Sequence, residues 1–121
     1  MASLRAKMNQ TALVGLLIVG LFGAVAPAQA NEAHEQLSAM PEAQRESFFA
    51  TYLTHDGEKC PVVARTFYQG SDAQGNAFWD VACRGADSWV VQVFNDENGS
   101  TKIVSCRALE AVKAAHCFRK F

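Results

Sequence analysis

The stretch AFWDVACRGADSWVVQVF, residues 77–94, decides the fold. Its two runs of aromatic and β-branched residues, 77–83 and 88–94, alternate as strands with one buried face do. Between them Arg84 to Asp87 form a tight turn around Gly85, which makes the two strands antiparallel neighbours. We therefore place one hairpin at the centre of a sheet.

The strand pattern continues on both sides of this hairpin. Residues 62–68 read as a first strand and residues 101–106 as a fourth, each separated from the hairpin by turn residues. Such short connections make consecutive strands antiparallel, so the sequence predicts a four-stranded meander. A helix at 41–54 precedes the sheet and a short helix follows at 107–114. We expect an α+β fold with the first helix packed on one sheet face.

The chain begins with the pattern of an export signal. Arg5 and Lys7 precede a continuous apolar run at 12–26, and Ala28-Gln29-Ala30 has the small-x-small sequence that signal peptidase cleaves. The run is shorter than the roughly 20 residues that span a bilayer. This predicts a signal peptide at 1–30 and no stable membrane insertion after cleavage.

The exported part is predicted to be one small domain. Residues 31–40 are expected to be a flexible segment and residues 41–121 a single domain, located in the periplasm or secreted. Loss of Arg5 and Lys7 leaves a net charge of about −3 on the exported part, judged from eleven Lys and Arg against twelve Asp and Glu in the whole chain. Nucleic acid as a partner is excluded because no basic face is available to neutralise phosphates.

Four cysteines follow the predicted cleavage site. In an oxidising compartment they are expected to form two disulfides. The meander brings Cys60, Cys83 and Cys106 to one end of the sheet, but Cys83 and Cys106 lie two strands apart, roughly 9 to 10 Å, which is too far for a bridge. Cys60 and Cys83 lie on adjacent strands and nearly level, so Cys60 is expected to pair with Cys83, and Cys106 then with Cys117.

The second face of the predicted sheet combines polar and apolar side chains. Arg65 and Asp80 fall roughly opposite each other there, as a cross-strand ion pair would. An apolar patch lies on the same face and forms a possible partner surface: Phe67, Phe78, Val90 and Phe94. The alternative is that the C-terminal helix and tail, with Phe118 and Phe121, cover this patch.

Catalytic and metal-binding patterns are sparse. The sequence contains no C-x-x-C or C-x-x-C-H motif, no phosphate loop and no nucleophile elbow, so we expect neither an enzyme nor a resident cofactor or metal. His116-Cys117 is the one adjacent pair of soft ligands. It keeps open an alternative in which the protein is a metal or haem accessory protein.

The runs Trp79–Cys83, Val90–Val93, Val104–Cys106 and Cys117–Phe121 together resemble small exported bacterial proteins to which no activity is attached. The order of one helix followed by a meander is also similar to periplasmic modules of the PepSY kind, an analogy of topology alone. The cysteines of this chain are not part of the PepSY pattern.

These features predict a soluble, exported, non-catalytic binding or accessory module. Its partner is expected to be another envelope or extracellular protein, or a small apolar ligand. A second alternative is a secreted protein inhibitor that uses the loop at 71–76 against the cleft of its target.

Overall fold

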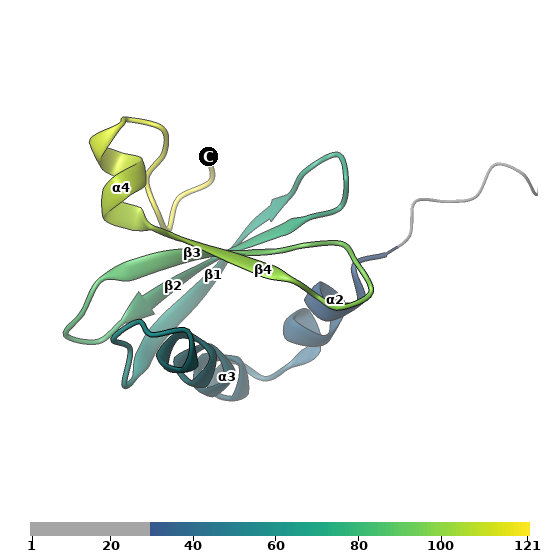
Figure 1. Cartoon of the computed structure of the whole chain (residues 1–121), viewed down its shortest axis with the longest axis horizontal. Helices are drawn as coiled ribbons and strands as arrows, with labels where there is room; N and C mark the ends of the chain where they lie inside the picture. The colour runs from purple at the N-terminus through teal and green to yellow at the C-terminus, as the bar shows by residue number, and fades with distance from the viewer. Residues whose placement is uncertain (1–29) are drawn as a thin grey trace, which may run out of the picture.

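The structure is a computed structural model that describes residues 30–121 (Figure 1). The predicted signal peptide, Ala30 apart, lies outside the described residues. The elements are, in order, α2 (Glu32–Ala39), α3 (Glu42–His55), β1 (Val63–Ser71), β2 (Ala77–Cys83), β3 (Ser88–Val93), β4 (Thr101–Ser105) and α4 (Cys106–Ala111). No helix within residues 30–121 combines the length and the apolar character needed to cross a membrane.

The sheet is the predicted meander. Its four strands lie in the order β1-β2-β3-β4, and every neighbouring pair is antiparallel. Figure 1 shows α2 and α3 on one face of the sheet, with α4 and the C-terminal tail on the other. The α+β fold expected from the sequence is thereby confirmed, with one helix more than expected on the first face.

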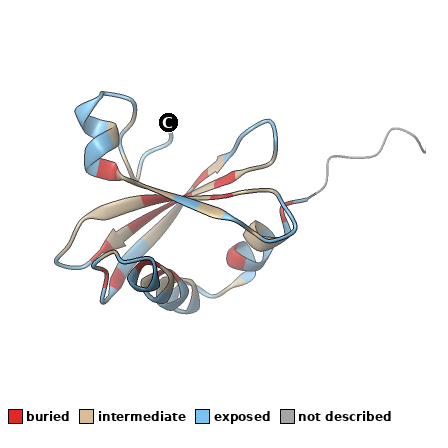
Figure 2. Ribbon diagram, viewed as in Figure 1, coloured by how far each residue is buried: buried red, intermediate tan, exposed pale blue. Residues whose placement is uncertain are grey.

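The core lies between the central hairpin and α3. Trp79 pairs with Val91 and Val81 with Trp89, so that one face of β2 and β3 carries large apolar side chains. On α3, Phe49 and Leu53 are four residues apart, share one helix face, and are almost completely buried against this sheet face (Figure 2). The alternation that predicted the strands therefore also specifies which face is buried.

Strand β1 is longer and less regular than expected. It continues to Ser71, and its register with β2 shifts twice, between Val63 and Arg65 and between Tyr68 and Gly70. Gly70 has φ of 126°, a conformation that L side chains rarely adopt, and this allows the strand to bulge where the sequence indicated a turn.

The segment at 31–40, expected to be flexible, is instead ordered as α2. The side chain of Asn31 accepts a hydrogen bond from the His34 amide and caps the helix. Its amide nitrogen donates to the carbonyl oxygens of Gly75 at 3.0 Å and Val93 at 2.9 Å, which joins the start of α2 to the sheet. Leu37 is buried in the core. The folded unit therefore begins near Asn31 and not at Pro41.

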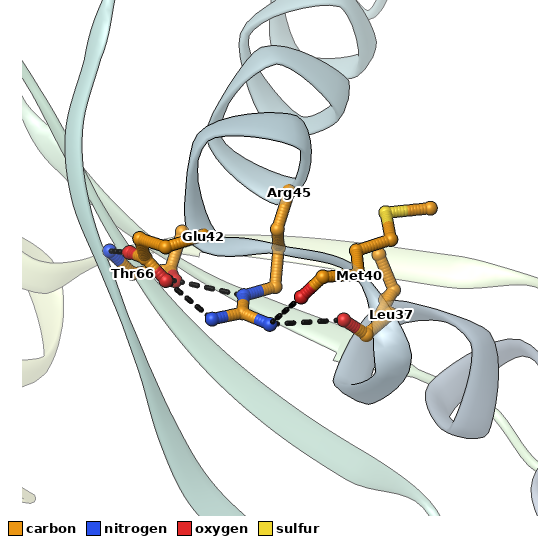
Figure 3. A network of polar contacts seen from close by, with 5 residues as sticks. All are labelled: Leu37, Met40, Glu42, Arg45 and Thr66. Atoms are coloured by element: carbon orange, nitrogen blue, oxygen red, sulfur yellow. Dashed lines mark hydrogen bonds and ion pairs between the residues drawn. The ribbon is translucent and has the colours of Figure 1, made fainter.

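Arg45 on α3 connects both helices to β1 (Figure 3). Its guanidinium donates to the carbonyl oxygens of Leu37 and Met40 at the end of α2, at 3.0 and 3.1 Å, and to the Thr66 hydroxyl at 3.0 Å. It also forms an ion pair with Glu42. The last carbonyl groups of a helix lack a partner one turn further along that helix, and Arg45 supplies a donor to Met40 and a second donor to Leu37, which also accepts from the Met40 amide.

Both predicted disulfides are present. Cys60 is bonded to Cys83 and Cys106 to Cys117, with Cα separations of 5.2 and 5.9 Å, and none of the four cysteines is free. Cys106 is the first residue of α4, and not the last of β4 as expected. The side chain of Ser105 accepts from the Ala108 amide and caps α4 at this point.

Candidate functional site

An apolar cavity of about 200 Å³ lies between the two N-terminal helices and the β3–β4 half of the sheet. We refer to it as the α2–α3 cavity. Its walls come from four parts of the chain: Ala33, Gln36 and Leu37 on α2, with Met40 directly after it; Phe48, Phe49 and Tyr52 on α3; Val91 and Val93 on β3; and Gly99 and Thr101 around the start of β4. Tyr52 is the one lining residue with a titratable side chain, so the cavity favours an apolar occupant.

The position of α3 explains why this space is not filled. The helix packs across β1 and β2, and leaves the β3–β4 half of the same face to shorter elements. That half is covered by α2, which has only eight residues, by the loop before β4, and by side chains that extend from α3, such as Tyr52. Gly99, with φ of 60°, brings this loop so near to α2 that a Cβ atom there would lie 3.0 Å from the Cβ of Ala33.

Aromatic residues of α3 form the rim of the α2–α3 cavity. Phe48 is 44% exposed, and it stacks with Tyr52 at 6.5 Å between ring centroids. The Tyr52 hydroxyl is hydrogen-bonded to that of Thr101, so α3 is connected directly to β4. The rim thus offers an exposed ring next to an edge strand.

Behind the cavity, His34 joins α2 to the aromatic core. Its Nδ1 accepts a hydrogen bond of 3.1 Å from the Trp79 indole, and its ring stacks on Tyr68 with centroids 4.5 Å apart. The Arg45 guanidinium lies 4.8 Å from the Trp79 ring centre. Burial lowers the pKa of His34 below its ordinary value, although the nearby carboxylate of Glu35 acts in the opposite direction. The hydrogen bond from Trp79 requires the neutral ring.

The apolar patch predicted on the second sheet face is largely covered. Phe67 is half-buried and meets the ring of Phe118 edge to face at 6.4 Å, while Phe78 and Phe94 are half-buried as well. Val90 is buried, so its inclusion in an exposed surface was wrong. The tail covers this face mainly through Phe118, since Phe121 remains 63% exposed.

A polar pair beneath the tail holds it in place. Asp80 is fully buried and accepts hydrogen bonds of 2.7 Å from the Gln69 side chain and from the Phe118 amide. Gln69 also accepts from the Phe121 amide at 3.2 Å. Burial raises the pKa of Asp80, against these hydrogen bonds and the charges of Arg65 and Lys120.

The cross-strand ion pair expected between Arg65 and Asp80 does not form. The irregularity in β1 places Arg65 opposite Ala82, and Phe67 opposite Asp80. The Arg65 guanidinium instead lies 4.4 Å from the centre of the Phe118 ring. The bulge interrupts the alternation, because Val63 lies in the core while Arg65, two residues later, lies on the opposite face.

The cysteines that the metal alternative needed are not available as ligands. Cys60 and Cys117 are both in disulfides, and a disulfide sulfur has no thiolate charge to offer a metal ion. His116 lies 4.0 Å from Glu110. Within residues 30–121 there is no group of three or more His, Cys, Asp or Glu side chains placed to hold a metal.

The loop at 71–76, proposed for an inhibitor, is internally hydrogen-bonded. One carboxylate oxygen of Asp72 accepts from the amides of Gln74 at 3.0 Å and Asn76 at 2.9 Å, and the other from the Asn76 side chain at 3.0 Å. These hydrogen bonds lower the pKa of Asp72, and the largest contribution comes from the side chain of Asn76. The loop is therefore held in one conformation while its tip is exposed.

The cavity was not predicted from the sequence because one of its walls, α2, lies in a segment that was expected to be flexible. The signal was present: Asn31 is a good helix cap, Glu32 and Glu35 stand in the first turn, and Ala33 and Leu37 are four residues apart. The role of Arg45 was not predicted, because only its ion pair with Glu42 is local and its other partners lie on different elements.

Comparison with known proteins adds no further assignment. No protein-family model matches the chain, no curated protein matches its sequence, and no solved structure matches its fold. The resemblance to small exported bacterial proteins and to PepSY modules consequently stays a prediction.

Proposed function

We propose that the protein is an exported, non-catalytic binding module whose partner inserts one apolar side chain into the α2–α3 cavity. The observation that carries this proposal is the cavity itself, an apolar hollow with the exposed ring of Phe48 at its rim. Two disulfides in a domain of this size fit an oxidising compartment, which supports export.

The size of the cavity favours a side chain over a larger ligand. Sites for drug-sized molecules and cofactors measure about 300 to 1,000 Å³, whereas a buried cavity of about 150 Å³ already accepts a benzene ring. At about 200 Å³ the α2–α3 cavity matches one aromatic or branched aliphatic side chain. Anchors of this kind, seated in an apolar pocket, dominate the affinity of many protein interfaces.

Peptide selection tests this proposal. A displayed library of linear 12-residue peptides is selected on the full exported protein with both disulfides formed, and dissociation constants are measured by fluorescence anisotropy. Gln36→Trp places a large ring at the mouth of the cavity from an exposed helix position, and Gln44→Trp is its control on the exposed surface of α3. We expect Gln36→Trp to weaken binding more than tenfold and Gln44→Trp to leave it unchanged.

A second pair of variants tests the rim. Phe48→Ala removes apolar area that the ligand would cover, and should weaken binding about five- to thirtyfold, from about 1 to 2 kcal/mol of lost burial. Phe121→Ala makes the same change at another exposed phenylalanine, away from the cavity. Failure to select any peptide, or equal affinity for Gln36→Trp and Gln44→Trp, would show that the cavity is not the binding site.

The fixed loop at 71–76 supports one other function, that of a secreted inhibitor. The hydrogen bonds around Asp72 hold the loop in one conformation. A loop that is fixed before binding loses little conformational entropy when it binds. Titration of serine, cysteine and metalloproteases with the protein would reveal it. Asp72→Ala should then weaken inhibition, while Gln36→Trp should not.

A further inference from the structure

The two edges of the sheet differ in how far side chains from other parts of the chain cover their backbone groups. At the β1 edge, the Thr66 amide donates to the Glu42 carboxylate at 3.1 Å, and the Tyr68 carbonyl accepts from the Lys120 ammonium at 2.9 Å. Side chains of α3 and of the tail thus occupy the backbone groups that would otherwise face outward. A further strand cannot pair there without displacing them.

The β4 edge has the opposite character. The Phe94 amide donates to the Ser100 carbonyl at 2.8 Å, which marks residues 94 and 100 as a hydrogen-bonded pair of the β3–β4 ladder. Bonded and non-bonded pairs alternate along an antiparallel ladder. Lys102 and Val104 therefore direct their backbone groups toward β3, and Thr101 and Ile103 direct theirs outward.

The α2–α3 cavity opens next to this edge. Thr101 lines the cavity, and Ile103, opposite Val91, lies on the same sheet face. Lys102 is exposed and points to the other face, because side chains alternate along a strand. The β4 edge thus combines outward backbone groups, an apolar hollow on one side and a single positive charge on the other.

We propose that the partner binds as an extended segment that adds a fifth strand to the sheet along β4. This rests on the proposed function and specifies the chemistry of the partner. The residues facing Thr101 and Ile103 lie on the face of the cavity and are apolar, and the one between them faces Lys102 and is acidic. The recognised pattern is therefore apolar–acidic–apolar in an extended chain.

A second copy of this protein fits the edge less well. Two β4 strands paired antiparallel around Ile103 would bring the two Lys102 side chains into diagonal positions, about 7 to 8 Å apart on one face. Like charges at that distance disfavour the pairing, whereas a carboxylate directly opposite Lys102 favours it. Charge complementarity therefore selects an acidic partner segment over self-association.

A charge reversal tests the pattern. The same 12-residue library is selected on the protein and on Lys102→Glu. The unsubstituted protein should enrich apolar–acidic–apolar peptides, and Lys102→Glu apolar–basic–apolar ones. Each protein should bind the peptides selected on it about two- to fivefold more tightly than the peptides selected on the other. One exposed cross-strand ion pair contributes an affinity difference of this size. The same enriched pattern on both variants would overturn the proposal.

Backbone pairing is tested by amide hydrogen exchange followed by NMR. When a selected peptide binds, exchange should slow at the outward amides of Thr101 and Ile103, and change little at Lys102 and Val104, which are already in the ladder. Ile103→Pro removes one outward donor without removing a ladder bond, and should weaken binding up to about tenfold. If this variant fails to fold, the exchange pattern of the unsubstituted protein with bound peptide still tests strand addition.

The outcomes separate this inference from the proposed function. If peptides bind, are blocked by Gln36→Trp and leave the Thr101 and Ile103 amides unprotected, the cavity binds a side chain but strand addition is wrong. If no peptide is enriched, both fail. A self-association that slows exchange at the same two amides without any peptide would replace the acidic segment with a second copy, and overturn the proposal.

Discussion

Removal of the Cys60–Cys83 disulfide should destabilise the domain more than removal of the Cys106–Cys117 disulfide. The first bridge closes a loop of 23 residues and the second a loop of 11. The loop-entropy relation gives about 3.4 kcal/mol for the first and about 2.8 kcal/mol for the second at 25 °C. Loop closure alone thus separates them by only about 0.7 kcal/mol.

Packing adds to this difference. Cys60 and Cys83 both belong to the buried core cluster, whereas Cys106 is buried outside that cluster and Cys117 is half-buried. Replacing a buried sulfur by the smaller alanine leaves a cavity that costs about 1 kcal/mol. The Cys60→Ala/Cys83→Ala variant therefore loses about 1 to 2 kcal/mol more than Cys106→Ala/Cys117→Ala.

Thermal unfolding followed by circular dichroism measures the difference. For a domain of this size 1 kcal/mol corresponds to about 4 to 8 °C, so the Cys60→Ala/Cys83→Ala variant should melt roughly 5 to 15 °C below the other. Peptide mapping confirms that the remaining bridge is intact in each. An equal or lower melting temperature for Cys106→Ala/Cys117→Ala would refute the reasoning, because the tail would then contribute to stability as core does.

Two further predictions concern ionisation. Because the folded-state pKa of His34 is lowered, its contribution to stability is fully present above the unfolded value near 6.5 and is lost as the pH falls through the folded value. His34→Gln should therefore flatten the decline in melting temperature between pH 7 and pH 5, and a parallel decline in both proteins would contradict this. The pKa of Asp80 is raised, so its contribution is present below the unfolded value near 3.8 and is lost as the pH rises through the folded value. The stability of Asp80→Asn relative to the unsubstituted protein, measured by urea unfolding, should consequently improve from pH 4 to pH 7, and a constant difference would show that burial does not control this carboxyl.

The sheet and the disulfides could be predicted because they depend on local pattern. Alternation over 77–94 specified the central hairpin, and the short turns left only one order for the other strands. Once the strand order was known, the distance limit for a disulfide excluded a bridge between Cys83 and Cys106. The position of Cys60 and Cys83 on adjacent strands then selected the observed pairs.

The rest depended on contacts between distant residues. Helix α2 has eight residues, too few to be stable alone, and it is ordered by Asn31, His34 and Leu37 against the sheet. The bulges in β1 interrupt the face alternation of the strand and place Arg65 opposite Ala82 instead of Asp80. The cap and first-turn residues of α2 are visible in the sequence, but the ordering of so short a helix and the position of the bulges depend on tertiary contacts.

The α2–α3 cavity follows from the number and length of the helices more than from any single side chain. A helix is about 10 Å across and strands are about 4.8 Å apart, so one helix covers about two strands of a four-stranded sheet. Helix α3 covers β1 and β2, and at 1.5 Å per residue the eight residues of α2 extend only about 12 Å over the remainder. A single substitution such as Gln36→Trp fills the cavity locally, whereas a longer α2 would remove its cause by covering the remaining strands.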